Sequence, residues 1–414
     1  MLGEQDDLLT ARATARCAGD ALPLVSSYTF EETSYQTISA EGVFPRTARV
    51  NDDTAIVFYT KSGNSTLYYR LVTVAPDYTT SFSAEATYLN LSPAAATGFD
   101  VAPLQDDKFI LVYRDNLTTR AVIGTHSAGT VTFGTPVDLN TELIPVLQTN
   151  QFEIAAVSAS RVVLCSKNTD NFKPCVQVID IDTSDVITYG TVAKTTADGG
   201  GSIASVRIAM LSATRGVLSW NSFVNIRAQV FTLSGTSASF AASSYSFPNA
   251  TQFPGYANYG VTNVSIKAVS ASAVLLVGAG SSTLNPDPTL YAPMYMVLTD
   301  DGAGGVLTST TANHDATYSD GGLMTGLYAS ILVGNNDAFV LHHSINTNPR
   351  VMHFTRLTGA APPSEDYDVA IDSITSPSAY RYPVGCQLRD YVYLGVIETS
   401  IASNFLKAFA IRAT

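Results

Sequence analysis

Three pairs of adjacent aspartates are the first groups in this sequence whose type and spacing could perform chemistry. They are Asp52 with Asp53, Asp106 with Asp107, and Asp300 with Asp301. Two carboxylates about 5 to 10 Å apart can hydrolyse a glycosidic bond, and carboxylate oxygens also bind Ca²⁺. The first two pairs occupy equivalent short turns, where aspartate favours the turn geometry, so we expect a structural role for them. Calcium binding by the third pair is the remaining alternative.

A turn motif found in sialidases, S-x-D-x-G-x-T-W, has no copy in this chain. The only tryptophan, Trp220, lies in the unrelated run VLSWNS. No other catalytic signature is present. We therefore expect a protein without enzymatic activity, and the sequence predicts no cofactor.

Three histidines fall on two neighbouring stretches of predicted strand. His342 and His343 are adjacent, and His353 follows ten residues after His343. Adjacent strand residues point to opposite faces of a sheet, so His342 and His343 cannot easily share one ion. No cysteine or carboxylate at suitable spacing completes a zinc site. We expect these histidines to be structural, and no metal site is predicted.

Two of the four cysteines bracket one loop. Cys165 and Cys175 are separated by nine residues, and in a hairpin symmetric about Asp170 they would face each other across two strands. Facing positions can satisfy disulfide geometry. Cysteine also packs well as a small apolar residue, so a disulfide and two free buried thiols both remain open.

One pattern recurs along nearly the whole chain and must position these groups. Apolar alternation leads to a short polar turn and then to a run of three or four apolar residues, seven times in all. An apolar residue before each turn marks the copies. The markers are Val50, Leu104, Val157, Leu211, Val269, Val333 and Leu388, separated by 53 to 64 residues.

Each copy continues through two further alternating stretches, which makes four strands per unit. Seven units of four antiparallel strands predict an all-β fold, a seven-bladed β-propeller over residues 25–414. The main alternative, a linear β-solenoid, usually has shorter repeats and parallel coils. The seventh copy ends at Thr414 after its third strand. Ser26 to Thr37 resembles the fourth-strand segment Thr130 to Leu139, so we expect an N-terminal strand to join the C-terminal blade and close the ring.

Residues 1–24 fall outside the repeat. Acidic residues near their start and arginines later fit a short helix whose charges complement its dipole. We interpret the segment as a docking arm ordered by a partner, with a frayed tail as the alternative.

Long connections on one face of the predicted ring carry many aromatic residues. Variable loops on a rigid scaffold commonly carry binding function, and aromatic rings can stack on sugars or anchor protein contacts. The alternative is that these rings only plug the surface. The candidate binding residues are Tyr245, Phe253, Tyr256, Tyr259, Tyr291 and Tyr318.

Charge and hydropathy exclude some classes of partner. The net charge is −12, with no basic stripe, which argues against a protein that coats nucleic acid. No apolar stretch approaches the ~20 residues of a membrane helix, so no membrane span is predicted. The start of the chain is acidic where a secretory signal would be basic.

The second unit, Phe109 to Asn140, contains IGTHSAGTVTFGTPVDL. It resembles a tandem repeat of tailed-bacteriophage structural proteins, of the form VGT-x-SG-x-TVTFG-x-PV. The close match covers about 30 residues, and the other units share only its skeleton. The resemblance implies a non-enzymatic virion component, such as a head decoration, collar or tail appendage. Its partners would be capsid or tail proteins through residues 1–24, with a host surface glycan as a further ligand.

Two other functions remain open from the sequence. One is a secreted or surface propeller that binds carbohydrate, which would place the protein outside the cell rather than in a virion. The other is a glycoside hydrolase whose carboxylates cannot be paired from one sequence.

Overall fold

The computed structural model shows a chain of strands, and no helix occurs in the part that it describes. The described residues are 28–30, 36–61, 63–91, 98–115, 118–139, 143–144, 152–168, 173–196, 203–222, 225–247, 262–281, 291–309, 313–314, 329–334, 337–344, 350–358, 364–374, 380–389, 392–401 and 403–413. Residues 1–24, the predicted docking arm, lie outside them.

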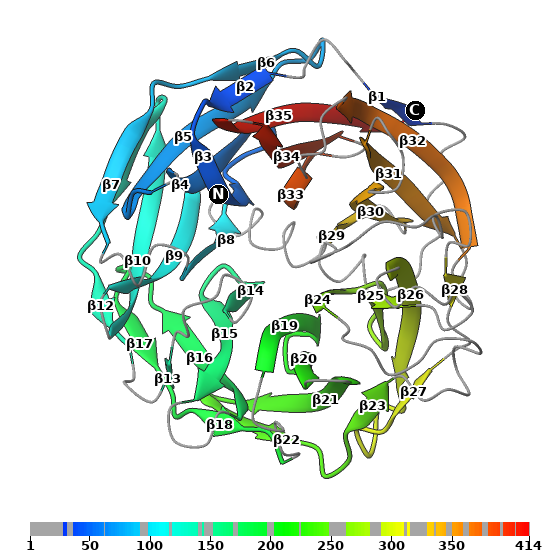
Figure 1. Cartoon of the computed structure of the whole chain (residues 1–414). Coiled ribbons are helices and arrows are strands. Elements are labelled where there is room, and N and C mark those ends of the chain that lie inside the picture. Colours follow the sequence, from blue (N-terminus) through cyan, green and yellow to red (C-terminus); the bar gives the residue numbers. More distant parts are fainter. Residues whose placement is uncertain are drawn as a thin grey trace.

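The strands within these residues form seven antiparallel sheets, which stand around a ring with one strand of each sheet nearest the centre (Figure 1). The prediction of an all-β propeller is therefore confirmed. Each sheet is called a blade, numbered in chain order. Blade 1 contains β3 (Gly42–Arg49), β4 (Thr54–Lys61), β5 (Thr66–Val74), β6 (Thr80–Phe82) and β7 (Ala86–Asn90). Blade 2 contains β8 (Phe99–Gln105), β9 (Lys108–Asp115), β10 (Thr118–Ser127), β11 (Thr130–Phe133) and β12 (Val137–Asp138).

The next three blades repeat this order. Blade 3 contains β13 (Leu143–Ile144), β14 (Glu153–Ser158), β15 (Arg161–Asn168), β16 (Pro174–Ile181), β17 (Ile187–Tyr189) and β18 (Ala193–Lys194). Blade 4 contains β19 (Ile203–Ser212), β20 (Arg215–Ser222), β21 (Asn225–Ser234), β22 (Ser237–Phe240) and β23 (Tyr245–Phe247). Blade 5 contains β24 (Thr262–Ala268), β25 (Ala273–Ser281), β26 (Tyr291–Asp300), β27 (Leu307–Ser309) and β28 (Asn313–His314).

The last two blades complete the ring. Blade 6 contains β29 (Ala329–Gly334), β30 (Asp337–Ser344), β31 (Arg350–Thr358) and β32 (Ser364–Ile374). Blade 7 contains β33 (Tyr380–Arg389), β34 (Val392–Ile401) and β35 (Ser403–Ala413), joined by β1 (Tyr28–Phe30) and β2 (Gln36–Ser39).

The two ends of the described chain meet in blade 7. Strand β1 runs antiparallel to β35, with Tyr28 opposite Ala413 and Phe30 opposite Ile411. Strand β2 continues along the same neighbour, with Gln36 opposite Ala408. The predicted closure by an N-terminal strand is confirmed. This pairing covers the edge of β35, which would otherwise be open to another chain.

The core is divided into layers between neighbouring blades. Second strands such as β4 are buried on both faces, because each face packs against an adjacent blade. Phe58 of blade 1 packs against Phe109 of blade 2, for example, with ring centroids 5.9 Å apart. Between blades 7 and 1, Leu394 and Val57 belong to one buried cluster. Apolar burial of this kind is what joins the blades into a rigid ring.

In six of the seven sheets of the described chain, two short pieces take the place of one continuous fourth strand, and both pair with the third strand. The break begins at residues 83, 134, 190 and 241 in blades 1 to 4, and its first N–H still bonds to a third-strand carbonyl. Polar side chains of the third strand fill the break: Gln177 Nε2 donates to Gly190 O at 2.8 Å and Gln229 Nε2 to Ala241 O at 2.6 Å. These side chains replace part of the missing strand pairing.

Candidate functional site

Charged side chains gather on the strands nearest the ring centre. Arg46 (β3), Asp100 (β8), Glu153 (β14) and Arg207 (β19) each lie four residues before the apolar residue that marks the repeat, so they occupy one register position in four successive blades. These inner strands contact their neighbours around the ring. Together with Lys267 of β24, these residues are called the axial cluster.

Each carboxylate of the axial cluster links two blades. Asp100 Oδ2 accepts a hydrogen bond from Ile154 N at 2.9 Å, and Glu153 Oε2 accepts one from Ile208 N at 3.0 Å. Since the inner strand has no neighbour on its central side, these N–H groups would lack a strand partner. The carboxylates therefore satisfy backbone donors at the open inner edges of the blades.

The second oxygen of each carboxylate faces a cation. Asp100 Oδ1 lies 3.6 Å from Arg46 Nε, and Glu153 Oε1 lies 3.5 Å from Lys267 Nζ. The Asp100 and Glu153 side chains are only 11% and 17% exposed, whereas Lys267 is 42% exposed. The cluster is thus mostly buried and opens to solvent at the lysine.

Burial raises the pKa of Asp100 to about 6, and the negative charge of Glu153 acts in the same direction, against the opposing effects of Arg46 and the Ile154 N–H. A carboxyl group with such a pKa can donate or accept a proton near neutral pH. General acid and base chemistry commonly uses two carboxyl groups whose environments differ, and Asp100 has a second carboxyl group, Glu153, in its electrostatic surroundings.

The sequence reasoning missed the axial cluster. Its signal was present in the repeat, where RTARV, DVAPL, EIAAV and RIAML each begin with a charged residue ahead of an otherwise similar pattern. Charged side chains at one position of an inner strand could have been recognised as facing a common axis. Adjacent acidic pairs do not reveal the cluster, because its members lie in different copies of the repeat.

The predicted aromatic site is only partly within the described residues. Tyr245 begins β23, and its hydroxyl donates to Ser309 Oγ of blade 5 at 2.6 Å, which gives it a contact between two blades. Tyr291 begins β26, and its side chain is not described. The other four candidates lie outside the described residues: Phe253, Tyr256, Tyr259 and Tyr318. These residues remain a prediction as a set.

The disulfide alternative for Cys165 and Cys175 is wrong, and both thiols are free and buried. The hairpin register pairs Cys165 with Val176 and Ser166 with Cys175, one residue away from the symmetric register. A shift of one residue sends the two side chains to opposite faces of the sheet. Cys165 accordingly packs toward blade 4 and Cys175 toward blade 2.

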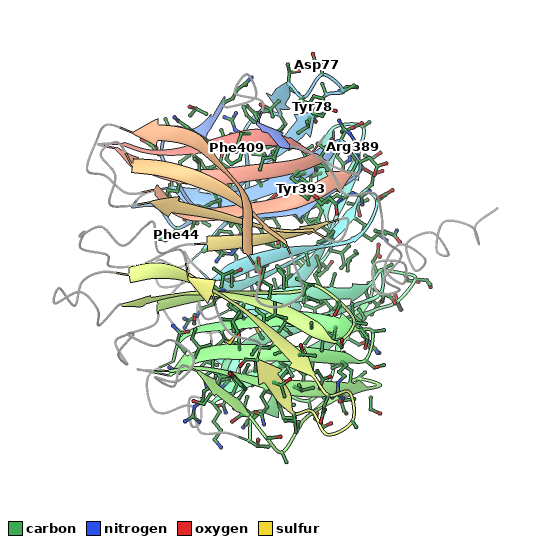
Figure 2. The ribbon with its side chains drawn as sticks, turned by 90° about the vertical axis from the view of Figure 1, so that its right-hand side faces the viewer. Phe44, Asp77, Tyr78, Arg389, Tyr393 and Phe409 are labelled. Carbon is green, nitrogen blue, oxygen red and sulfur yellow. The ribbon has the colours of Figure 1, made fainter. Side chains whose placement is uncertain are left out.

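The aspartate pairs make more contacts than a turn requires. Arg49 reaches Asp52 at 2.6 Å and Asp106 of the next blade at 2.8 Å. Arg389 of blade 7 binds the Asp53 carboxylate and the carbonyl oxygens of Val74 and Ala75, all three in blade 1 (Arg389 is labelled in Figure 2). These turns therefore also join blades 7, 1 and 2.

Protein groups engage the third acidic pair. Arg215 forms a two-pronged ion pair with Asp300, and Asp301 Oδ1 accepts hydrogen bonds from the N–H groups of Gly304, Gly305 and Val306. These contacts give Asp300 a role in an interblade bridge and Asp301 a role in a turn. Within the described residues, no group of three or more His, Cys, Asp or Glu side chains is arranged to hold a metal ion.

The histidines lie where the strand pattern predicted. His342 of β30 stands opposite His353 of β31, and His343 stands opposite Met352. Their side chains are not described. In the described part of the chain, no helix has the length and apolar character needed to cross a membrane.

No protein-family model matches the sequence, and neither does any curated protein. Solved structures share its fold. A putative 6-phosphogluconolactonase from Bacteroides fragilis is 10% identical with a TM-score of 0.48, covering 85% of this chain and 88% of its own. Polysaccharide lyase Uly1 is 10% identical with a TM-score of 0.47, covering 97% and 95%. The Dos1 propeller is 9% identical with a TM-score of 0.44, covering 93% and 95%.

These similarities concern the fold, and the chain is a β-propeller. The expectation of a protein without enzymatic activity is corrected by the same comparison. Structures of this fold include, besides the lactonase and the lyase, an arabinanase, a sialidase and a xylosidase. The missing sialidase turn motif excluded one signature and did not exclude catalysis on this scaffold.

Proposed function

We propose that the axial cluster is the reaction centre of a propeller that acts on carbohydrate. The observation that supports this most is Asp100, a buried acid with a pKa of about 6 beside a second carboxylate, Glu153. Both lie on inner strands, where successive blades converge. Cations on either side, Arg46 and Lys267, can orient a polar substrate.

The two carboxyl groups have different environments and take different roles. Asp100, whose pKa is raised by burial, donates its proton to the glycosidic oxygen as the bond to the anomeric carbon breaks. Glu153 removes a proton from the water that attacks that carbon. The net reaction adds one water across the bond, and solvent returns the proton from Glu153 to Asp100.

The test separates chemistry from structure. Asp100→Asn and Glu153→Gln keep an oxygen that can accept the Ile154 and Ile208 N–H groups. We expect the wild type to release reducing ends from at least one member of a panel of neutral and acidic polysaccharides. Each variant should remain folded and lose about 100-fold or more of this activity. Absence of turnover across the panel, or activity retained by both variants, would contradict the proposal.

A second proposal concerns where the protein acts. The resemblance of Phe109 to Asn140 to tailed-phage structural repeats supports a position in a virion, as a head decoration, collar or tail appendage. A closed ring with a covered strand edge suits a component present in many copies, because it limits unwanted strand pairing. An extracellular carbohydrate-directed propeller is the alternative location.

Particle association tests this location. We expect the protein to co-sediment with phage particles and to co-purify with a major capsid or tail protein. Deleting residues 1–24 should abolish the association if they form the docking arm. Recovery only as a free protein in the culture medium would favour the extracellular alternative.

A further inference from the structure

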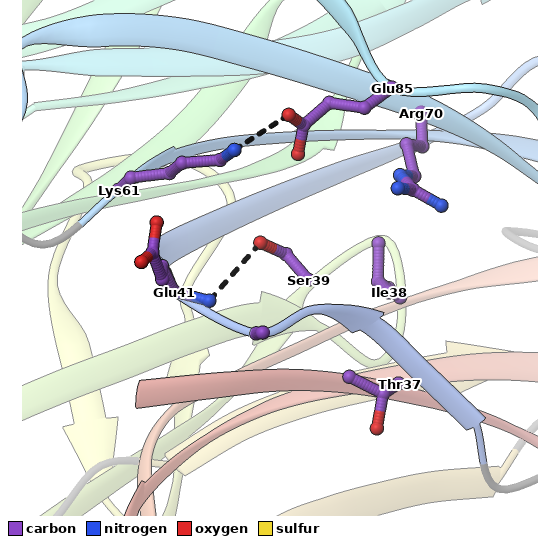
Figure 3. A pocket seen from close by; sticks show the side chains of 8 residues that line it. Thr37, Ile38, Ser39, Glu41, Lys61, Arg70 and Glu85 are labelled. Carbon is purple, nitrogen blue, oxygen red and sulfur yellow. Dashed lines mark hydrogen bonds and ion pairs between the residues drawn. The ribbon is translucent and has the colours of Figure 1, made fainter. Parts of the chain in front are cut away.

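The N-terminal strands β1 and β2, which pair with β35 and close the ring, are together called the closing strand. A pocket of about 360 Å³ lies at the seam where its β2 part meets blade 1 (Figure 3). One wall comes from β2 and the two residues that follow it, and the other comes from β4, β5 and the break in the outer strand of blade 1. Pockets of this volume accommodate small ligands. The lining residues are Thr37, Ile38, Ser39, Ala40, Glu41, Lys61, Arg70 and Glu85.

Arg70 is the unusual residue of this pocket. It occupies the third-strand position that Gln177 holds in blade 3 and Gln229 in blade 4. In each blade this position lies two residues before the third-strand residue that pairs with the last residue ahead of the break in the outer strand. In blade 4 the glutamine also donates a hydrogen bond to the Thr196 hydroxyl of blade 3, so a side-chain hydrogen bond connects these two blades. In blade 1 the side chain is charged and the seam holds a pocket instead.

One donor of Arg70 is unmatched. Among the described residues, Arg70 Nε is buried and has no hydrogen-bond partner. A buried donor left unpaired costs about 1 to 3 kcal/mol. Arg70 as a residue is only partly buried and lines the pocket, so the accessible part of its guanidinium can pair with an anionic oxygen of a ligand there.

The other charges of the pocket are largely balanced within the protein. Glu85 accepts hydrogen bonds from Lys61 Nζ at 2.7 Å and from the Tyr59 hydroxyl at 2.6 Å. Burial would raise the pKa of Glu85, but these two donors outweigh it and lower that pKa, so the group is a carboxylate. The Lys61–Glu85 pair is neutral overall, and Arg70, whose charge also acts on Glu85, makes this side of the pocket positive by one charge.

The remaining polar groups favour a hydroxylated ligand over a bare ion. Glu41 is exposed, and in Figure 3 its carboxylate lies at the opposite end of the drawn cluster from Arg70. A carboxylate can accept hydrogen bonds from ligand hydroxyls, whereas it repels a second anionic group. Ser39 adds a hydroxyl group on the same wall, and its oxygen accepts a hydrogen bond from Glu41 N at 3.4 Å.

We propose that this seam pocket binds a sugar acid, with the ligand carboxylate on Arg70 and ligand hydroxyls toward Glu41. The site lies on blade 1 and the closing strand, apart from the axial cluster, and does not depend on the function proposed for that cluster. It would hold a uronic acid residue of a polysaccharide or a free sugar acid.

Binding of glucuronate to the full chain, measured by calorimetry, tests the proposal. We expect glucuronate to bind and glucose, which lacks the carboxylate, not to bind. Arg70→Gln installs the residue found at this position in blades 3 and 4, so the fold should accept it. It should weaken glucuronate binding about tenfold or more. Arg70→Lys keeps the charge but loses the Nε donor, and should give an intermediate loss.

A control variant locates the binding. Arg161→Gln removes an arginine from another surface pocket, where it pairs with Asp180, and should leave glucuronate affinity unchanged. The proposal is overturned by absence of glucuronate binding to the wild type, or by equal affinity of the wild type and both Arg70 variants, which would place the binding elsewhere on the molecule.

A polysaccharide of uronic acid distinguishes the two possible sources of the carboxylate. If an oligomer of glucuronate binds more tightly than the monomer and Arg70→Gln removes the gain, the pocket recognises a polymer residue. If monomer and oligomer bind equally, it recognises a free sugar acid. Either result supports the site, since both depend on Arg70.

Discussion

The ring of Phe409 occupies the space where a side chain on Gly395 would stand. The two residues are direct partners on β34 and β35, and a Cβ atom on Gly395 would come within 2.3 Å of the Phe409 ring (Phe409 is labelled in Figure 2). The same arrangement joins Gly124 to Phe109 and Gly216 to Phe231. In three blades, then, a cross-strand glycine makes room for an aromatic ring of the core.

Gly395→Ala should destabilise the protein because the added methyl group overlaps the Phe409 ring. Overpacking of a core costs about 1 to 3 kcal/mol, and we expect a clear fall in the thermal midpoint. Gly134→Ala is the control, since a Cβ there would meet only Ile123 O at 3.7 Å. Equal melting of the two variants would show that the ring moves aside without cost.

Asp100 should make stability depend on pH. Burial and Glu153 raise its pKa to about 6 in the folded state, above its value in the unfolded chain. The folded state therefore binds more protons between pH 4 and 6, so the free energy of unfolding falls as pH rises through this range. A shift of about two units corresponds to about 3 kcal/mol.

Asp100→Asn should lack this contribution while keeping an acceptor for Ile154 N–H. The stability of the wild type minus that of the variant, from urea unfolding, should decrease from pH 4 to pH 6 and then level off. A difference that is constant with pH would mean that Asp100 titrates at its ordinary value.

The bridge between Arg215 of blade 4 and Asp300 of blade 5 should contribute strongly to stability. The Asp300 side chain is 2% exposed, so Arg215→Ala would leave a buried carboxylate without its cation, at a cost of about 3 kcal/mol or more. The double variant with Asp300→Asn should recover part of the loss. Asp138→Asn, which breaks only the exposed pair of Asp138 with Arg120, should cost less than about 1 kcal/mol.

The Arg215 variant should also show an opposite pH dependence. Burial alone would raise the pKa of Asp300, but hydrogen bonds from Arg215 outweigh it and hold that pKa below its usual value. The stabilisation is present above the unfolded pKa and is lost as pH falls through the folded one. The difference between wild type and Arg215→Ala should therefore shrink in acid, as urea titrations at pH 3 and pH 7 would reveal.

Removing the closing strand should open the ring. Deletion of residues 26–37 removes β1 and part of β2 and exposes the edge of β35. We expect a broader thermal transition and aggregation detectable by light scattering. Deletion of residues 1–24 is the matched control and should leave the melting curve unchanged. A sharp, unshifted transition in the first variant would contradict the closing role.

The fold and the ring closure could be predicted because both follow from short sequence patterns that repeat along the chain. Alternation of apolar and polar residues identifies a strand. The apolar residue before each turn, such as Val50, recurs every 53 to 64 residues, which indicates one structural unit repeated along the chain. The match of Ser26 to Thr37 with a fourth strand then implied that the first residues complete the last unit. Strand pairing of Tyr28 with Ala413 follows that logic.

The register of strand pairing, and the residues distant in sequence that become neighbours, could not be predicted in the same way. The assumption of a hairpin symmetric about Asp170 placed Cys165 and Cys175 on one face, and a slip of one residue separates them. The register decides which side chains fill the two neighbouring layers, Cys165 in one and Cys175 in the other, and those layers form only when the blades pack together.

The sequence by itself determined an all-β, repeated architecture that closes on itself. Hydrophobic periodicity and a last copy with three strands can both be recognised from the linear order of residues. Only the tertiary structure decided which charges share an environment. Asp100 and Glu153 are 53 residues apart, yet the ring brings their inner strands together. Arg70 likewise lines a pocket with Thr37 and Glu41, which lie about 30 residues earlier in the chain. Proximity, burial and the pKa that results are properties of the folded ring, because each depends on atoms that the chain order does not place near one another.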